Sequence, residues 1–348
     1  MTQKRKIQIS RKSFIELLDY LKNHQHQWLV TGAAGFIGSN LCHKLLQLNQ
    51  KVIGLDNLST GLEKNIEEIE RSKNSNWKFI KADIRDTELF AVHLQKTDFV
   101  LHQAAVGSVP RSIKEPLVSH GSNVDGFVKL LDAVKTTKVK KFVYASSSSV
   151  YGDEPNLPKV EDRVGNPLSP YAVTKKINEI YAAIYHRCYQ TPVVGLRYFN
   201  VFGPRQDPGG PYAAVIPIWI KAAILNEPLS INGDGTFSRD FCFIDNVMQA
   251  NLLAALSDKI CDGQVYNIAF GDRTTLSELA KMIISRTTQL QEKKCLSQIV
   301  HRVPREGDIP HSHANVDHAR KDLNYSPQVS VEQGLETTIR FHLEMMKG

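Results

Sequence analysis

The sequence predicts an α/β fold in which a doubly wound parallel sheet is joined to a smaller α/β domain at the C-terminal end. Three observations support this prediction. Short apolar runs alternate with stretches of helical periodicity over residues 27–199, and the first of these runs ends in a series of glycines. Beyond residue 200 the predicted elements become shorter and more irregular. Strands that alternate with helices at this spacing form βαβ units, whose strands lie parallel.

This pattern divides the chain into three regions. We expect a helical extension over 1–26, the main sheet over 27–199, and a mainly separate smaller domain over 200–348. One strand near 264–269 is expected to return to the main sheet. The extension should pack its apolar face on the main body, and that face consists of Phe14, Leu17, Leu18 and Leu21.

The composition is that of a soluble globular protein, with 42% hydrophobic and 23% charged residues among 348. The chain has no apolar run of about 18 residues, so we expect no membrane span. The net charge is +7, and the lysines and arginines are interspersed with acidic residues instead of forming a stripe. This pattern argues against a nucleic-acid partner and suits a small anionic ligand. The cysteines form no CxxC pair, which favours reduced thiols, a cytoplasmic protein and no structural zinc. They are Cys42, Cys188, Cys242, Cys261 and Cys295.

A glycine-rich turn follows the first apolar run. Trp28–Thr31 reads as a strand and Ser39–Leu46 as a helix, and Gly32, Gly35 and Gly38 lie between them. Such glycines let the backbone approach a pyrophosphate, which the free N–H groups of the helix then bind. An ordinary strand-to-helix turn is the alternative, and the spacing is one residue wider than the common dinucleotide fingerprint. The flanking strand and helix favour a Rossmann-type nucleotide site.

An acid at the end of the second strand indicates which dinucleotide binds. Asp56 follows the apolar run Lys51–Leu55, where it can accept the adenosine-ribose hydroxyls and repel a 2′-phosphate. We therefore predict NAD as the cofactor. Further strands are predicted at 77–84, 98–105, 141–146 and 193–198. Besides the glycines and Asp56, the predicted cofactor contacts are Phe36, Ile37, Asn57, Ser59, Thr60, Gly61, Asp83, Ile84, Gln103, Ala104, Ala105, Asn123, Tyr171, Lys175 and Tyr198.

Two stretches carry the predicted chemistry. Ser147 and Ser148 lie at the carboxyl end of the fifth strand, where open α/β sheets bind ligands. Tyr171 and Lys175 are four residues apart at the start of a helix and share one face. The ammonium, with a cationic nicotinamide ring, should lower the tyrosine pKa and make the phenol a general base for a secondary alcohol.

These motifs resemble the extended short-chain dehydrogenase/reductase superfamily over about residues 26–340, through Thr31–Gly38, Ser147, Tyr171 and Lys175. Within it the chain is similar to the nucleotide-sugar 4-epimerases, closest to bacterial UDP-N-acetylglucosamine (UDP-GlcNAc) 4-epimerases. The segments that carry this second resemblance are Arg197–Pro204, Asn232–Gly235, Arg239–Phe241 and Arg305–Asp308.

The resemblance implies a substrate site. Asn200 and the 213–215 segment would hold the nucleotide diphosphate and uracil, Arg239 and Arg305 would bind the phosphates, and Asp308 would accept the ribose hydroxyls. The full predicted substrate set is Gly107, Ser108, Ser147, Ser148, Tyr171, Asn200, Ala214, Val215, Asn232, Arg239, Arg305, Asp308 and Ser312.

The same resemblance indicates the reaction and the sugar. Family dehydratases and decarboxylases carry carboxylates after the residue equivalent to Ser147, and this chain has serines there, so epimerisation is favoured. Ser312, seven residues beyond Arg305, is small enough to admit an N-acetyl group, and Ser108 would lie near that group. We therefore expect interconversion of UDP-GlcNAc and UDP-N-acetylgalactosamine (UDP-GalNAc), for surface polysaccharide such as O-antigen.

Other functions stay open at this point. Epimerases of UDP-N-acetyl-hexosaminuronic acids or of UDP-glucose and UDP-galactose are the alternatives within the family. An NAD-sensing regulator without turnover and a free-standing NADP reductase belong to different classes. The intact Ser147, Tyr171 and Lys175 argue against the regulator, and Asp56 argues against the reductase.

Two further expectations concern partners. His311 and His313 could bind a metal, but no other ligand cluster accompanies them, so we predict a loop and no metal. The family resemblance implies a homodimer formed through the helices that contain Asn123 and Tyr171. The outer face of the second helix carries Ile180, Ala183 and Ile184.

Overall fold

A computed structural model describes residues 13–210, 213–257, 263–303 and 310–346. Its centre is a parallel sheet of seven strands in the order β11-β6-β5-β4-β1-β2-β3. The sheet starts from β1 and is extended in both directions, so it is doubly wound as predicted. Its strands are β1 (Gln27–Thr31), β2 (Lys51–Asp56), β3 (Trp77–Lys81), β4 (Phe99–His102), β5 (Lys141–Ser147), β6 (Val193–Tyr198) and β11 (Val265–Ile268).

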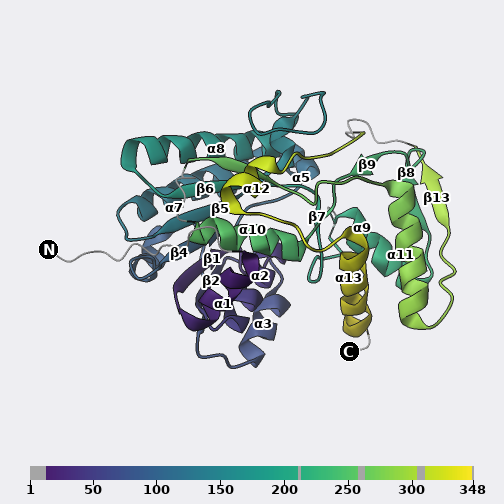
Figure 1. Cartoon of the computed structure of the whole chain (residues 1–348), viewed down its shortest axis with the longest axis horizontal. Helices are drawn as coiled ribbons and strands as arrows, with labels where there is room; N and C mark the ends of the chain where they lie inside the picture. The colour runs from purple at the N-terminus through teal and green to yellow at the C-terminus, as the bar shows by residue number, and fades with distance from the viewer. Residues whose placement is uncertain (1–12, 211–212, 258–262, 304–309, 347–348) are drawn as a thin grey trace.

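Helices cover both faces of this sheet (Figure 1). Alternate residues of each strand point to opposite faces, so Val30 joins one hydrophobic core and Leu29 the other. One face packs against α2 (Phe36–Gln47) and α10 (Ile244–Leu256), and the other against α7 (Gly126–Lys135) and α8 (Pro170–Tyr189). The two cores make the sheet a rigid platform whose carboxyl edge presents the loops. The shorter helices of this region are α3 (Glu63–Arg71), α4 (Ala91–Leu94), α5 (Val109–Lys114) and α6 (Pro116–His120).

The N-terminal extension contains one described helix, α1 (Phe14–Asn23). Ser13 and Glu16 form a capping box at its start, which satisfies two otherwise free N–H groups. Leu17 and Leu21 are buried in the core that contains α2, and Phe14 and Leu18 pack against that core. The helix therefore lies on the main body through the face that the sequence predicted.

The C-terminal part is interleaved with the main sheet more than the predicted boundary at residue 200 suggests. β11 pairs with β6, in the place expected for a returning strand, and α10 packs on the same sheet. The remaining elements form a separate lobe (Figure 1). This lobe contains β7 (Val201–Phe202), α9 (Val215–Leu225), β8 (Leu229–Asn232), β9 (Ser238–Arg239), β10 (Cys242–Phe243), β12 (Thr274–Thr275), α11 (Leu276–Gln291), β13 (Ile299–Arg302) and α13 (Val331–Met345), while α12 (Asp317–Leu323) packs near β11.

Two predicted strands are shorter in the structure. The strand predicted over 77–84 ends at Lys81, because Asp83 begins a turn by accepting a hydrogen bond from the Arg85 backbone N–H at 2.9 Å. The strand predicted over 98–105 covers only Phe99–His102, and the residues after it form a loop at the carboxyl edge. Both loops therefore lie where ligands of open α/β sheets bind.

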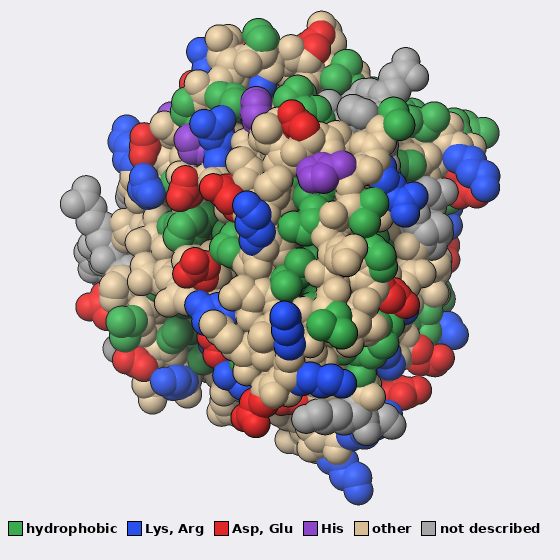
Figure 2. Space-filling model, turned by 90° about the vertical axis from the view of Figure 1, so that its right-hand side faces the viewer, with side chains coloured by type: hydrophobic (Ala, Val, Ile, Leu, Met, Phe, Trp, Pro, Cys, Tyr) green, Lys and Arg blue, Asp and Glu red, His purple; other side chains and the backbone are tan. Residues whose placement is uncertain are grey.

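The surface agrees with the charge pattern of the sequence. Figure 2 shows the face of the C-terminal lobe, where acidic and basic side chains are interspersed rather than gathered into one basic stripe. In the described ranges, no helix is both long enough and apolar enough to cross a membrane.

Candidate active site

The glycine turn between β1 and α2 is built so tightly that side chains do not fit. Gly32 has a φ of +70°, and a Cβ there would lie 2.7 Å from the Ala104 backbone nitrogen. A Cβ on Gly38 would lie 2.0 Å from the carbonyl oxygen of Gly32. Helix α2 then begins at Phe36, capped by Gly35 without a side-chain bond and with no acid in its first turn. Its first N–H groups are consequently available to an anion.

A cavity of about 90 Å³ opens beside this turn, at the carboxyl ends of β1, β2 and β4. Asp56 is buried against it and accepts hydrogen bonds from the N–H groups of Ala34 at 3.0 Å and Leu58 at 2.8 Å. Burial raises the pKa of the Asp56 carboxyl, and these backbone donors oppose that rise. Predicted residues that line the cavity are Gly32, Gly35, Asp56, Asn57, Ser59, Thr60, Gly61, Asp83, Ile84, Gln103, Ala104 and Ala105. Residues that the sequence reasoning missed are Leu55, Ala82, Val106 and Ser122.

Asp83 is held rigidly at the rim of this cavity. Arg85 donates to both of its oxygens, at 2.8 and 2.9 Å, and Asn57 donates at 2.8 Å. These donors lower the pKa of Asp83 to about 2. The carboxylate is therefore charged and fixed in position at neutral pH.

Two predicted cofactor residues have their side chains occupied by the protein instead. Asn123 is buried and exchanges hydrogen bonds with the backbone of Val106, at 2.7 and 3.2 Å. The Tyr198 hydroxyl donates to Gln103 at 3.1 Å and contacts Asn251. Both side chains thus hold the loop after β4 by hydrogen bonds. Neither of them lines the cavity.

A second and larger cavity, of about 260 Å³, lies in the C-terminal lobe, among residues of β7, α9, β8, β9 and α11. Five predicted substrate residues line it, namely Asn200, Ala214, Val215, Asn232 and Arg239. Its remaining lining is mainly apolar and aromatic, which suits a planar base. Those further residues are Val201, Phe202, Gln206, Ile216, Trp219, Ser230, Phe237, Phe241 and Leu276.

The structure brings Ser312 next to Asn200, although 112 positions separate them in the chain. The Asn200 side-chain amide donates to the Ser312 hydroxyl at 3.4 Å and to the Asp240 carbonyl at 3.1 Å. Arg239 donates to the carbonyls of Ser238 and Pro310, each at 3.0 Å. Arg305 and Asp308 lie outside the described residues.

The histidines beside Ser312 have structural partners. His311 bonds the Ser238 hydroxyl at 2.9 Å, and His313 lies 3.2 Å from the carbonyl oxygen of Gly271. Within the described ranges no three His, Cys, Asp or Glu side chains are grouped so as to hold a metal. Cys242 lies in the core as a free thiol, and Cys42, Cys188 and Cys295 are free thiols as well. Cys261 lies outside the described residues.

The predicted catalytic residues lie together where β5 ends and α8 begins. The Tyr171 hydroxyl shares a hydrogen bond with Ser147. The Lys175 Nζ donates to the Ala145 carbonyl at 2.8 Å and lies 5.9 Å from the centre of the Tyr171 ring. Ser148 is half-buried in the following turn. A phenol, a hydroxyl and an ammonium thus share one edge of the sheet.

The surroundings of the Tyr171 phenol shift its pKa in opposite directions. Burial raises the pKa of Tyr171, and this effect is larger than the lowering by Ser147. The Lys175 ammonium donates a hydrogen bond to the Ala145 carbonyl. Burial also lowers the pKa of Lys175 to about 8. The lowering of the tyrosine pKa that we expect from this ammonium together with a cationic nicotinamide ring stays a prediction.

The segment 107–112 joins the catalytic helix to the loop after β4. Ser108 has a φ of +99° and caps α5 by accepting a hydrogen bond from the Arg111 N–H at 3.2 Å. Ser112 accepts a hydrogen bond from the Tyr171 N–H at 3.0 Å. A Cβ on Gly107 would have nothing within 4 Å, so this side of the site is open.

Comparisons with known proteins agree with this geometry. The family model of the NAD dependent epimerase/dehydratase family matches residues 28–269. A UDP-glucose 4-epimerase from Mycolicibacterium smegmatis is 37% identical over 315 residues, which cover 90% of this chain and 97% of that protein.

Solved structures show the same likeness. A UDP-N-acetylglucosamine 4-epimerase from Methanobrevibacter ruminantium, in complex with UDP-N-acetylmuramic acid, is 37% identical with a TM-score of 0.84, over 92% of this chain and 99% of that one. A UDP-glucuronic acid 4-epimerase from Bacillus cereus, bound to UDP-glucuronic acid and NAD, is 35% identical with a TM-score of 0.80 and the same coverage. The chain belongs to the NAD dependent epimerase/dehydratase family, and the predicted superfamily, fold and cofactor are confirmed.

Proposed function

We propose that this NAD-dependent UDP-sugar 4-epimerase acts on UDP-GlcNAc and UDP-GalNAc, which differ only at C4 of the sugar. The observation that carries the proposal is the grouping of Tyr171, Ser147 and Lys175 at the sheet edge. One cavity lies beside the glycine turn and the loop after β4, and the other lies in the C-terminal lobe. One cavity suits a dinucleotide and the other suits a nucleoside diphosphate.

The residues around the glycine turn fit NAD. The N-terminus of α2 carries no side-chain cap and no acid, so it can bind the pyrophosphate. Asp56 would accept the adenosine-ribose hydroxyls, and Asp83 and Ile84 would lie beside the adenine. Gln103–Ala105 would contact the nicotinamide half. When bound, NAD would accept a hydride from the sugar and return it.

Tyr171 would take the proton from the 4-hydroxyl of the sugar and later give it back. Ser147 would orient that hydroxyl, since it already bonds the phenol. Lys175 would hold a positive charge near the phenolate. The 4-keto sugar would then turn about its diphosphate link, so that the hydride returns to the opposite face. No net oxidation results, so NAD would stay bound between turnovers.

The substrate would be held by its nucleotide rather than by its sugar. Asn200, Asn232 and Arg239 line the larger cavity together with aromatic side chains that can pack on uracil. A firm hold on the diphosphate leaves the hexose free to present either face to one base.

The identity of the sugar depends on the space beside Ser312. Its small side chain lies next to Asn200, which lines the larger cavity, and a Cβ on Gly107 would have nothing within 4 Å. The small side chain at position 312 would therefore leave room in the site for the N-acetyl group of the substrate. A UDP-N-acetylglucosamine 4-epimerase is among the relatives that are 37% identical.

Other substrates are the alternatives. Relatives named for UDP-glucose and UDP-glucuronate are about as similar, at 37% and 33% identity. The corresponding N-acetylated uronic acids would also fit a small residue at position 312. A regulator without turnover would have no need for the intact group of Tyr171, Ser147 and Lys175.

One experiment separates these possibilities. The purified protein is incubated without added cofactor with UDP-GlcNAc, UDP-glucose, UDP-glucuronate and UDP-N-acetylglucosaminuronate, and the products are separated by chromatography. The proposal predicts that UDP-GalNAc forms fastest. A higher kcat/KM on any other sugar would contradict the substrate assignment. If no sugar gave a product, the proposed epimerase activity would be contradicted.

We also propose that two copies associate through α6–α8. Apolar side chains on this surface are exposed, among them Leu117, Val118, Ile180 and Tyr181. Val124, Val128 and Ile177 line a groove between the same helices. Light scattering should give the mass of a dimer, and Ile180→Glu should give a monomer. A monomeric wild type would contradict the proposal.

We further propose a cytoplasmic location and a role in polysaccharide synthesis.

A further inference from the structure

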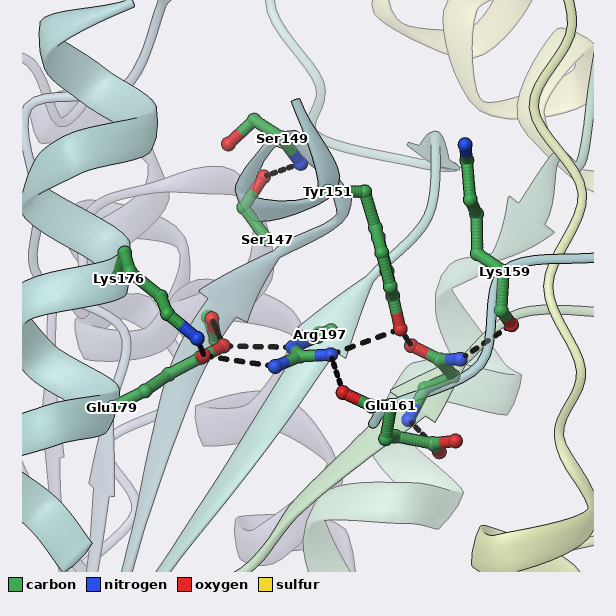
Figure 3. A network of polar contacts seen from close by, with 10 residues as sticks. Ser147, Ser149, Tyr151, Lys159, Glu161, Lys176, Glu179 and Arg197 are labelled. Atoms are coloured by element: carbon green, nitrogen blue, oxygen red, sulfur yellow. Dashed lines mark hydrogen bonds and ion pairs between the residues drawn. The ribbon is translucent and has the colours of Figure 1, made fainter. Parts of the chain in front are cut away.

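A buried ion pair joins Glu179 on α8 to Arg197 on β6 (Figure 3). Arg197 on β6 donates to both oxygens of the Glu179 carboxylate, at 2.8 and 2.9 Å. The two side chains are only 2% and 6% exposed. Ser146, the residue before Ser147, donates to the same carboxylate at 2.6 Å. Glu179 therefore contacts both β5 and β6 from its place on α8.

The pair continues into a network that reaches the C-terminal lobe. Arg197 donates to the Tyr151 hydroxyl and to the Glu161 carbonyl, each at 3.0 Å. Tyr151 in turn donates to Asn267 on β11 at 2.6 Å. The Asn267 amide donates to the Asn315 carbonyl at 3.1 Å. Asn315 lies three residues after Ser312, so the network ties the sugar side of the site to α8.

Stability alone does not explain this pair. Burying two charges costs as much as their attraction returns, and apolar residues of similar volume are often as stable. The position of Glu179 suggests another reason. It is four residues after Lys175, so the two side chains share one face of α8. Its carboxylate is the nearby negative charge that acts on that ammonium.

We infer that Glu179 is a positioning residue, which keeps the Lys175 ammonium charged and holds the serine end of β5 against α8, while Arg197 fixes the carboxylate. This inference rests on the proposed function for its catalytic meaning. Ser146 and Arg197 hold the carboxylate by hydrogen bonds, and the Lys176 Nζ on the same helix lies 3.7 Å from it.

The groups around Lys175 make the effect of Glu179 measurable. Burial lowers the pKa of Lys175 to about 8, and the charge of Glu179 opposes that lowering. Tyr171 lies on the same helix face, with its ring centre 5.9 Å away. On β4, burial lowers the pKa of His102 to about 3, so this ring is neutral at working pH. Without Glu179, the Lys175 pKa should fall by about one unit, which is the order expected for the loss of a neighbouring opposite charge.

The test compares Glu179→Gln with wild type by two measurements on the NAD-bound protein. The first is the pH dependence of kcat/KM, whose alkaline limb reports loss of the ammonium. The second is competitive labelling of the Lys175 amine by acetic anhydride, read by peptide mass spectrometry, which needs no turnover. We expect the alkaline limb and the midpoint of labelling both to move to lower pH by about one unit.

Glu161→Gln is the matched control. Glu161 is also a buried carboxyl of this network, and it lies at the end of the network remote from Lys175. It accepts a hydrogen bond from the Asn267 N–H at 2.8 Å. This variant should disturb the network but leave both midpoints in place. Midpoints that stay unchanged in Glu179→Gln, or that move equally in both variants, would overturn the inference.

A second variant keeps the test decisive if Glu179→Gln does not fold with Arg197 unpaired. Glu179→Gln/Arg197→Met removes both charges, and the labelling midpoint of Lys175 should still fall, by less than in the single variant. A midpoint equal to that of wild type would overturn the inference. A wild type that turns over no UDP-sugar would refute the proposed function, and the labelling would still decide the role of Glu179.

Discussion

Replacing Gly38 by alanine tests whether the glycine turn holds NAD. The added Cβ would lie 2.0 Å from the carbonyl oxygen of Gly32 and 2.7 Å from its carbonyl carbon. Both are backbone atoms of the turn. Because real Cβ contacts of this kind are not shorter than 3.0 Å, the start of α2 and the turn must separate by about 1 Å. Substitution at Gly38 therefore acts on the place proposed for the pyrophosphate.

The size of the effect follows from the hydrogen bonds that this shift would break. Losing two charge-assisted bonds from the α2 N-terminus, at about 1.5 kcal/mol each, weakens NAD binding by about 3 kcal/mol. That is a fall in affinity of about 150-fold. Overpacking should also lower the free energy of unfolding by about 1–3 kcal/mol.

The assay is the NAD content of the purified protein, followed by calorimetric titration with NAD. Gly121→Ala is the control, since a Cβ there would meet its nearest atom at 3.5 Å, an ordinary contact. This control should purify with as much NAD as wild type. If Gly38→Ala also kept its full NAD content and affinity, the turn would not be the pyrophosphate site.

Three further predictions concern the sugar, the ammonium and the buried pair. Ser312→Tyr should reduce kcat/KM on UDP-GlcNAc by more than about 100-fold, because the ring fills the acetamido space, and should spare UDP-glucose; equal loss on both would remove this role. The kcat/KM of wild type should fall as pH rises through about 8, where Lys175 loses its proton; a flat profile up to about pH 10 would contradict this. Arg197→Met should lower the free energy of unfolding by about 3–5 kcal/mol in urea, since it leaves Glu179 buried and unpaired; a loss below about 1 kcal/mol would mean that Glu179 finds another partner.

Features that depend on neighbouring residues were predictable from the sequence. The sheet follows from apolar runs punctuated by turns, and strand Val193–Tyr198 has the predicted bounds. The glycine turn was predictable because Gly32 and Gly38 meet within one tight bend. Lys175 and Tyr171 share a helix face, so their grouping needs only the helical period.

Features that depend on distant segments were not predictable in this way. Nothing in the local pattern brings Ser312 beside Asn200, or Glu179 against Arg197. The spacing of Glu179 from Lys175 was a usable signal, but its meaning appears only once β6 supplies the guanidinium. The tyrosine pKa was also beyond sequence reasoning, because burial, which is set by the whole fold, raises it more than Ser147 lowers it.

The central claim is that the Tyr171 phenol moves the proton of a tethered sugar alcohol, and one measurement tests it directly. Wild type and Tyr171→Phe, each with its NAD content determined, are compared for the rate of UDP-GalNAc formation from UDP-GlcNAc. The account predicts that the variant keeps its NAD and loses between about 100- and 10,000-fold in kcat. A variant that retains NAD and forms product at the rate of wild type would contradict the account.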